Sequence, residues 1–139
     1  MIVLDTNVLS EALKPVPSHK VLGWLSTQDQ STTFITAITQ AEILYGIELL
    51  PAGKRKAQLQ SSISKLFEQE FADHILSFDH SAAEAYSRIA AAHRAAGRPI
   101  SQFDAMIAAI VHVEGAKLAS RNASDFADCG IEIVNPWKD

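Results

Sequence analysis

The sequence lacks the features that mark secreted, membrane-bound or disulfide-stabilised proteins. Its 139 residues include a single cysteine, Cys129, so no disulfide can form within the chain. The opening apolar run, Ile2–Leu4, is too short for a signal peptide, and no stretch approaches the ~20 apolar residues that a membrane helix needs. We therefore expect a soluble, cytoplasmic protein with no membrane association.

An excess of basic residues is also missing. The formal net charge is −4, from 16 acidic and 12 basic residues. Proteins that hold nucleic acid mainly by electrostatic attraction carry a positive excess instead. A nuclease is not excluded, because cations bound to a cluster of acidic residues reverse the local charge. The net charge therefore limits the possible functions without deciding among them.

Linkers, internal repeats and low-complexity tracts are absent as well. Hydrophobic residues make up 47% of the chain and charged residues 20%, which is typical of a globular protein. A chain of this length can bury a substantial core within one domain. We predict a single α/β domain over residues 1–139.

Short apolar runs alternate with longer amphipathic segments along the chain. We predict strands at residues 2–4, 34–36, 75–78, 117–120 and 131–134. Longer helices are predicted at about residues 39–50, 54–71, 82–96 and 102–114, and shorter ones directly after Asp5 and at 20–26. Strands separated by helices predict a mainly parallel sheet of about five strands that is covered on both faces.

Asp5, Glu42 and Asp104 are the candidate catalytic residues. Asp5 directly follows the first predicted strand, and the other two acids fall in the first turns of predicted helices. Ligands of open parallel sheets bind beyond the carboxyl ends of the strands, so all three side chains can point into one crevice. The small residues that could let the helices approach closely there are Ala41, Gly46, Ala105, Ala108 and Ala109.

Three carboxylates in one crevice repel one another unless a cation is present. Their proximity raises the pKa of at least one of them. Mg²⁺ or Mn²⁺ relieves the repulsion, because hard cations prefer oxygen ligands. Such ions can activate a water molecule and stabilise the leaving oxygen of a phosphodiester. The chemistry expected of the three acids is therefore metal-dependent phosphodiester hydrolysis.

Each acid also has a purely structural interpretation. Asp5 precedes a helix, where Asp is a favoured N-cap residue. Thr39–Glu42 and Ser101–Asp104 have the spacing of a capping box, with a hydroxyl three residues before an acid. Ser81–Glu84 has the same pattern and no other sign of function, so the pattern alone is not specific.

Polar residues follow the fourth predicted strand at the same edge of the sheet. Asn122 or Asp125 could add an oxygen ligand to the metal, Ser120 could hold a water molecule or a phosphate, and Arg121 could contact a phosphate. The structural alternative is a loop with an Asx turn and a short helix.

Taken in order, these segments resemble PIN-domain proteins of the VapC/FitB type. The likeness is carried by residues 2–10 (IVLDTNVLS), 41–47 (AEILYGI), 104–109 (DAMIAA), 120–122 (SRN), 125–126 (DF) and 134–137 (VNPW). It covers essentially the whole chain at compatible spacing. The resemblance implies a three-layer α/β/α fold and an Mg²⁺- or Mn²⁺-dependent endoribonuclease that cleaves RNA such as tRNA or rRNA.

The resemblance also implies roles for individual residues. The three candidate acids match the acidic residues of the family. The fourth acid of many PIN domains falls at Asn122, which is an amide here, and we expect Asp125, one helical turn further, to supply the missing charge. Asn7 matches a position that orients Asp5 by hydrogen bonding.

Partners follow from the same resemblance. Proteins of this type act as toxins of type II toxin–antitoxin pairs, form homodimers and are neutralised by a small antitoxin with a DNA-binding part. The antitoxin's tail occupies the toxin's groove and often places a basic side chain among the acids, which suits an acidic toxin. The toxin would reach operator DNA only through the antitoxin.

Other functions fit the sequence less well. A haloacid-dehalogenase-like phosphatase needs a second Asp two residues after the first, and that position is Asn7. A receiver domain needs an acidic pair after the first strand, which is absent, and only Asp79 could accept a phosphoryl group. No Gly-rich phosphate loop occurs. The remaining alternative is a non-catalytic interaction module that acts only through antitoxin binding, although retention of the three acids favours the enzyme.

Several further residues have predicted roles of lower specificity. The five histidines show no metal-ligand spacing, and we predict packing roles for Trp24, Trp137 and Cys129. The basic residues that could contact phosphate, without any support from their position, are Lys14, Arg94 and Arg98.

Overall fold

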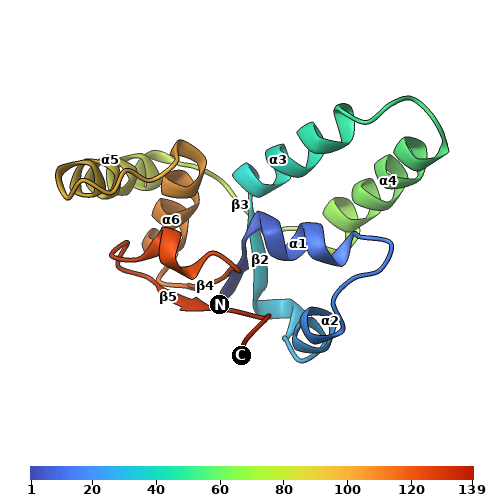
Figure 1. Ribbon diagram of the computed structural model, residues 1–139, viewed down its shortest axis with the longest axis horizontal. Coiled ribbons are helices and arrows are strands. Elements are labelled where there is room, and N and C mark those ends of the chain that lie inside the picture. Colours follow the sequence, from blue (N-terminus) through green and yellow to red (C-terminus); the bar gives the residue numbers. More distant parts are fainter.

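Five short parallel strands form the centre of the computed structural model, which describes residues 1–139 (Figure 1). The strands are β1 (Ile2–Leu4), β2 (Thr33–Thr36), β3 (Ile75–Leu76), β4 (Lys117–Ala119) and β5 (Glu132–Val134). Their order in the sheet is β3-β2-β1-β4-β5, and every neighbouring pair is parallel. The chain therefore starts on the central strand, builds one side of the sheet and then the other, as in doubly wound folds.

Every connection except the last contains α-helices, and the last contains only a short 3-10 helix. The α-helices are α1 (Thr6–Ala12), α2 (His19–Ser26), α3 (Ala37–Glu48), α4 (Lys54–Lys65), α5 (His80–Ala95) and α6 (Gln102–Glu114). Three short segments complete the set, namely the 3-10 helices η1 (Gln30–Thr32) and η3 (Ala123–Phe126) and the π-helix η2 (Leu66–Glu70).

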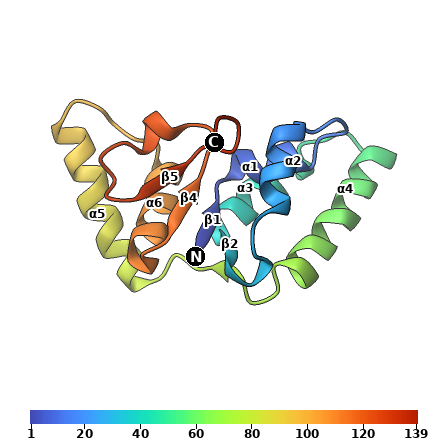
Figure 2. The ribbon, with the colours of Figure 1, turned by 90° about the horizontal axis from the view of Figure 1, so that it is seen from below.

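The helices cover both faces of the sheet, so the predicted three-layer α/β/α fold is confirmed. Side chains of β1 alternate between the faces. Ile2 and Leu4 belong to the core cluster formed with α1 to α4, whereas Val3 packs with Ile107 and Val111 of α6. Figure 2 shows the two groups of helices on opposite sides of the sheet, with α5 lying along α6.

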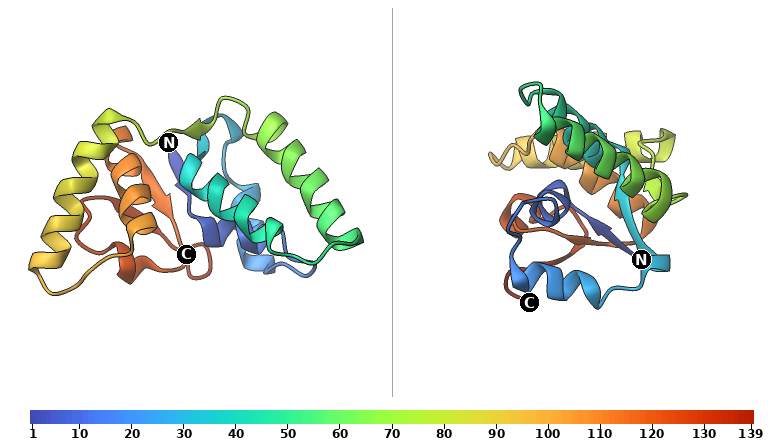
Figure 3. Two further views of the ribbon diagram at one scale, coloured as in Figure 1. Left: turned by 90° about the horizontal axis from the view of Figure 1, so that it is seen from above. Right: turned by 90° about the vertical axis from the view of Figure 1, so that its right-hand side faces the viewer.

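Each group contains a pair of neighbouring helices. In Figure 3, α3 and α4 run side by side on one side of the sheet, and on the other side α5 lies along α6, which packs on the sheet. Gly115 ends α6 in the left-handed conformation (φ 62°), which favours glycine and turns the chain into β4. No helix of the molecule is long and apolar enough to cross a membrane.

The predicted helices are confirmed, with some shifted boundaries. The helix predicted at 102–114 matches α6 at both ends. The segment predicted as one helix over 54–71 is instead α-helical to Lys65 and π-helical from Leu66 to Glu70. The helix predicted from residue 39 begins at Ala37, so Glu42 lies in its second turn rather than its first.

Two of the three possible capping boxes are not formed. The N-cap of α3 is Thr36, whose hydroxyl accepts a hydrogen bond from the Thr39 amide, and the N-cap of α5 is Asp79. Thr39–Glu42 and Ser81–Glu84 therefore do not cap helices. Ser101 is the N-cap of α6, as that interpretation predicted.

We expected small residues to allow a close approach of both α3 and α6, and only those of α6 are buried. Ala105, Ala108 and Ala109 of α6 are completely buried, consistent with close packing of this helix. Ala41 and Gly46 of α3 are exposed instead, so the prediction that they allow a close approach of α3 was wrong.

Candidate active site

The three candidate acids line one cavity at the carboxyl ends of the central strands. Asp5 follows β1, Glu42 comes from α3, and Asp104 comes from the first turn of α6. The cavity has a volume of about 400 Å³. Its lining residues are Asp5, Thr6, Asn7, Ser10, Glu11, Lys14, Glu42, Asp104, Arg121, Asn122 and Trp137. Elements far apart in the sequence thus bring the three acids together where the sheet-edge rule predicted.

Asp5 is the most buried of the three acids, with 4% of its surface exposed. One carboxylate oxygen, Oδ1, accepts a hydrogen bond from the Thr6 amide at 2.8 Å, which also makes Asp5 the N-cap of α1. The other oxygen, Oδ2, accepts from the Ser120 hydroxyl at 2.7 Å and the Asn7 amide at 3.3 Å. The capping role and the place in the cavity therefore coexist in this one side chain.

Burial raises the pKa of Asp5 to about 6. The hydrogen bonds from Ser120 and Thr6 oppose this rise, and the negative charges of Asp104 and Glu42 add to it. The charge of Asp5 is therefore unfavourable near neutral pH, as expected for a buried carboxylate with two acidic neighbours.

Ser120 and Asn7 form hydrogen bonds that connect the carboxyl ends of the neighbouring strands β1 and β4. The pairing of Leu4 with Ala119 places the next residues, Asp5 and Ser120, side by side. Asn7 spans the same junction, because its Oδ1 accepts from the Arg121 amide at 3.3 Å while its Nδ2 donates to Asp5. The orienting role that the resemblance implied for Asn7 agrees with this geometry, and Ser120 makes the shorter contact.

Glu42 is oriented by a residue that the sequence did not single out. The Thr6 hydroxyl donates to Glu42 Oε1 at 2.8 Å and lies 3.0 Å from the hydroxyl of Thr39. Since Thr6 has one hydroxyl proton, Thr39 must donate the second bond. For Thr39, the second threonine of this network, the only available signal was spacing, because it stands one helical turn before Glu42 on the same face of α3.

Asp104 is half-buried and lies in the first turn of α6. Its amide donates to the hydroxyl of the N-cap Ser101 at 3.2 Å. Burial raises the pKa of Asp104, the Ser101 hydroxyl lowers it, and the charge of Asp125 raises it further. The capping interpretation of Ser101–Asp104 is thus correct without excluding a role in the cavity.

The structure places Asn122 and Asp125, the two candidates for the fourth polar residue of the site, in different cavities. Asn122 lines the acidic cavity, and its amide donates to the Ser120 hydroxyl at 3.1 Å. Asp125, in η3, lines a neighbouring cavity of about 290 Å³ that also includes Asp104. The short helix predicted here is present, and it places Asp125 on the far side of Asp104, within electrostatic reach of that carboxylate.

Two basic residues, Arg121 and Lys14, also line the cavity. The Arg121 guanidinium lies over the Trp137 ring, 5.0 Å from the ring centre. Lys14 donates to the buried Glu11 at 3.0 Å, and this contact is the main cause of the lowered pKa of Glu11. Sequence reasoning missed Glu11 and gave Trp137 only a packing role, whereas both line the cavity.

The donor set suits a hard divalent cation that keeps part of its water shell. Every acidic ligand in the cavity offers carboxylate oxygen, which Mg²⁺ and Mn²⁺ prefer. No three His, Cys, Asp or Glu side chains form a group that could hold a metal ion by themselves. Mg²⁺ does not require such a cage, since one or two carboxylates plus water and substrate phosphate commonly bind it. Asp5, Glu42 and Asp104 fit this mode.

The sequence and the fold are those of a known class of protein. The PIN domain family model matches residues 2–131, nearly the whole chain. The chain therefore belongs to the PIN domain family.

Relatives within that family narrow the type. The chain is 38% identical over 138 residues to VapC ribonuclease Y4jK of Sinorhizobium fredii, with 99% of each chain covered. It is 35% identical to toxin FitB of Neisseria gonorrhoeae over the full length of both. A solved structure of FitAB bound to an IR36 DNA fragment superposes with a TM-score of 0.95 at 34% identity, covering 100% of this chain and 97% of that chain. These relatives match the VapC/FitB type that the sequence motifs indicated.

Proposed function

We propose that this protein is an Mg²⁺- or Mn²⁺-dependent endoribonuclease and the toxin of a type II toxin–antitoxin pair. The observation that carries the proposal is the buried Asp5 carboxylate, held by Ser120 and Asn7 in the same cavity as Glu42 and Asp104. A carboxylate kept buried beside two other acids costs folding free energy, and a bound cation offsets that cost. The likeness to a protein named VapC ribonuclease supports the same activity.

In this proposal, different residues of the cavity have different roles in hydrolysis. Asp5, Glu42 and Asp104 would hold the cation, which when bound supplies an activated water and stabilises the leaving oxygen of the phosphodiester. Ser120, Asn7 and Thr6 fix the orientation of the first two carboxylates.

A proton acceptor and a phosphate contact complete the cavity. The raised pKa of Asp104 makes its carboxylate a better proton acceptor than an ordinary aspartate, which suits it to accept the proton of the attacking water. Arg121 and Lys14, which also line the cavity, can hold a phosphate of the RNA chain. Asp125 acts on the reaction through the charge it adds beside Asp104. We propose tRNA or rRNA as the substrate, on the strength of the family likeness.

A small antitoxin with a DNA-binding part is the proposed partner. An apolar cavity lined by Leu13, Ile43 and Leu50 adjoins the acidic one and shares Glu42 and Lys14 with it. An antitoxin tail could rest apolar residues there and extend a basic side chain towards the acids. Operator DNA would be reached through the antitoxin, and the FitAB structure on DNA supports such an assembly.

We also propose a homodimer in the cytoplasm. Leu44, Tyr45 and Leu49 of α3 leave 42%, 66% and 67% of their surfaces exposed, a concentration of apolar surface that a second copy could cover.

Cleavage of RNA by the purified protein tests the enzymatic proposal against the interaction module. We expect cleavage with Mg²⁺ or Mn²⁺, none with excess chelator, and a loss of more than about 100-fold in Asp5→Ala. Asp73→Asn is the matched control, because Asp73 is exposed and precedes β3 at the opposite edge of the sheet. Cleavage that survives Asp5→Ala or the chelator would refute the carboxylate–metal mechanism. If no RNA is cleaved while the antitoxin still binds, the protein is an interaction module.

A further inference from the structure

A second cavity meets the acidic one at Asp104. Its volume is about 290 Å³, close to the lower end of the roughly 300–1,000 Å³ that ligand pockets occupy, so it has room for one sugar or base. Its lining residues are His93, Arg98, Pro99, Ile100, Ser101, Asp104, Ser124, Asp125 and Ala127. Asp104 is the one residue that lines both cavities. A chain molecule bound at the three acids can therefore continue past Asp104 into the second cavity.

The end of α5 holds the backbone of Arg98 beside this cavity. The helix ends in a Schellman motif, in which Gly97 adopts the left-handed conformation (φ 71°). The Gly97 amide donates to the carbonyl of Arg94 at 3.1 Å. The Arg98 amide donates to the carbonyl of His93 at 2.9 Å. The side chain of Arg98 thus extends from a fixed point of the backbone.

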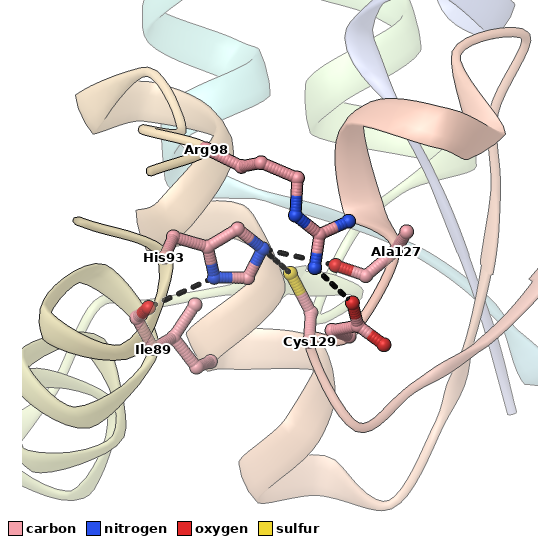
Figure 4. Close-up of polar contacts among 6 residues, drawn as sticks. Ile89, His93, Arg98, Ala127 and Cys129 are labelled. Carbon is pink, nitrogen blue, oxygen red and sulfur yellow. Dashed lines mark hydrogen bonds and ion pairs between the residues drawn. The ribbon is translucent and has the colours of Figure 1, made fainter. Parts of the chain in front are cut away.

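The wall of the cavity that Ala127 forms is joined to α5 as well. Ala127 directly follows η3, and its carbonyl oxygen lies 2.9 Å from Nε2 of the buried His93 (Figure 4). The same nitrogen lies 3.8 Å from the Cys129 sulfur, and Nδ1 lies 2.9 Å from the carbonyl oxygen of Ile89. Because the His93 ring contacts both α5 and the segment after η3, these two walls of the cavity are connected directly.

Arg98 has most of its hydrogen-bonding capacity free. It forms an ion pair with Asp128 through one terminal nitrogen, Nη2 (Figure 4). The two side chains are 59% and 69% exposed, and ion pairs as exposed as this contribute little to stability. A guanidinium has five N–H donors in a planar fork, which matches the oxygens of a phosphate. The contact with Asp128 therefore does not prevent Arg98 from binding a phosphate.

Each of the two cavities contains basic residues. Arg121 and Lys14 line the acidic cavity, and Arg98 lines the second one, whereas Arg94 lines neither. Single-stranded RNA carries one phosphate per nucleotide, so a strand that passes the three acids presents a further phosphate to the residues beyond Asp104. Arg98 is the basic residue at that place.

The other polar groups of the second cavity suit the sugar or base attached to such a phosphate. The Ser101 hydroxyl accepts from the Asp104 amide at 3.2 Å and keeps its own proton for donation. The Ser124 hydroxyl can donate or accept, and the Asp125 carboxylate can accept from a ribose 2′-OH or from an N–H group of a base.

We propose that the second cavity is an RNA-binding subsite, in which Arg98 binds the backbone phosphate next to the scissile one and the cavity receives the attached sugar or base. Asp128 is the counter-ion of Arg98 in the free protein, and the RNA phosphate competes with it. The position of the scissile phosphate rests on the proposed ribonuclease function, whereas the contact between Arg98 and RNA does not require cleavage.

Binding of a short, fluorescein-labelled single-stranded RNA of mixed sequence tests this contact without turnover. Fluorescence anisotropy gives the Kd, with Ca²⁺ in place of Mg²⁺ to neutralise the carboxylates and a gel to show that the probe stays intact. We expect Arg98→Gln to raise the Kd about 10-fold. The slope of log Kd against log salt concentration should fall by about 0.7, the value for one lost phosphate contact on a single strand.

Two matched variants distinguish a phosphate contact from its alternatives. Arg94→Gln removes the same charge from the same end of α5, and we expect it to change the Kd by less than about twofold, because Arg94 lines neither cavity. Asp128→Asn breaks the ion pair and keeps Arg98, and asparagine tolerates the left-handed conformation of Asp128 (φ 63°). We expect Asp128→Asn to bind the RNA at least as tightly as wild type, because Arg98 loses its competing counter-ion.

Three results would overturn the subsite. One is a Kd that is unchanged in Arg98→Gln. Another is an equal loss of affinity in Arg94→Gln, which would mean that RNA responds to overall charge alone. The third is a loss in Asp128→Asn as large as that in Arg98→Gln, because binding would then need the ion pair and not the free cation.

Failure of the subsite and failure of the ribonuclease proposal give different results. Wild type that binds the RNA through Arg98 but cleaves none with Mg²⁺ or Mn²⁺ refutes the ribonuclease and supports the subsite. Wild type that cleaves RNA while Arg98→Gln leaves the Kd unchanged refutes the subsite alone. Wild type that binds no RNA also refutes the subsite.

Discussion

At the scale of single residues, Asp5 is the acid of the candidate site whose negative charge is most disfavoured by burial. This carboxylate lies at the end of the central strand, almost without solvent, between one hydroxyl, two N–H donors and two other acids. Its hydrogen bonds keep it oriented but do not fully replace lost hydration, so its pKa stays near 6.

The stability of the metal-free protein should therefore fall as Asp5 ionises. Between pH 3.8 and about 6 the folded protein retains a proton on Asp5 that the unfolded chain has released, so stability decreases with rising pH across this window and stays at the lower level above it. We predict that Asp5→Asn stabilises the metal-free protein by about 2–3 kcal/mol at about pH 8 and by much less at about pH 4. Thermal unfolding with a chelator checks this. A variant that is less stable than wild type at pH 8 would contradict it.

Ser120 should tune the pH dependence of cleavage. Its hydroxyl donates to Asp5 at 2.7 Å and lowers the pKa of that carboxyl against the effect of burial. In Ser120→Ala we expect the acidic limb of the pH–rate profile to move to higher pH, with a rate loss of about 10- to 100-fold near pH 6. Raising the Mg²⁺ concentration should move the limb back, because the cation competes with the proton. An unchanged limb would show that Asp5 is not the titrating group.

At the scale of elements, periodicity and strand ends predicted most of the architecture. The alternation of apolar runs located all five strands, and the amphipathic pattern of residues 102–114 located α6 completely. The rule that ligands bind at strand ends predicted one crevice for Asp5, Glu42 and Asp104, and all three line the same cavity.

Tertiary packing decided the details that the sequence could not predict. Thr36 and Thr39 have equal capping propensity and are both completely buried, and they differ in their contacts: the Thr36 hydroxyl accepts from the Thr39 amide, whereas the Thr39 hydroxyl contacts Thr6. The place of Asp125 depends on the rotation of η3 about its own axis, and a spacing rule does not contain that rotation. Contacts between distant segments, such as Arg121 with Trp137, were equally invisible.

The link between α1 and α3 supports a prediction at this scale. Thr6→Val keeps the shape of the side chain and removes the hydroxyl that donates to Glu42. We expect the apparent Mg²⁺ affinity during cleavage to weaken by about 10- to 100-fold. Thr27→Val, at the exposed end of α2, serves as the control. A variant with normal metal dependence would mean that Glu42 needs no support from Thr6.

At the scale of the whole molecule, the distribution of charge and apolar surface suits an assembly. The apolar cavity lies next to the acidic cavity, which is also lined by the basic residues Arg121 and Lys14. Helix α3 adds an exposed apolar face. A partner with a basic, partly apolar tail and a second copy of the chain would together cover these surfaces.

Substitution on α3 tests the proposed homodimer. Tyr45→Asp places a charge in the centre of the exposed apolar residues of this helix, where a dimer interface would bury it. We expect sedimentation velocity to show a dimer for wild type and a monomer for Tyr45→Asp, with unchanged circular dichroism. A dimer that persists in Tyr45→Asp would place the interface elsewhere.

The central claim is that the cavity around Asp5, Glu42 and Asp104 is a divalent-cation site. Binding of Mn²⁺ measured by electron paramagnetic resonance tests it most directly, because free and bound Mn²⁺ give distinct signals without any turnover. We predict that the wild-type protein binds Mn²⁺, that Asp73→Asn binds it equally, and that Asp5→Asn reduces the affinity by at least about 10-fold. Mn²⁺ binding that is equally tight in Asp5→Asn and in the wild type would contradict the account.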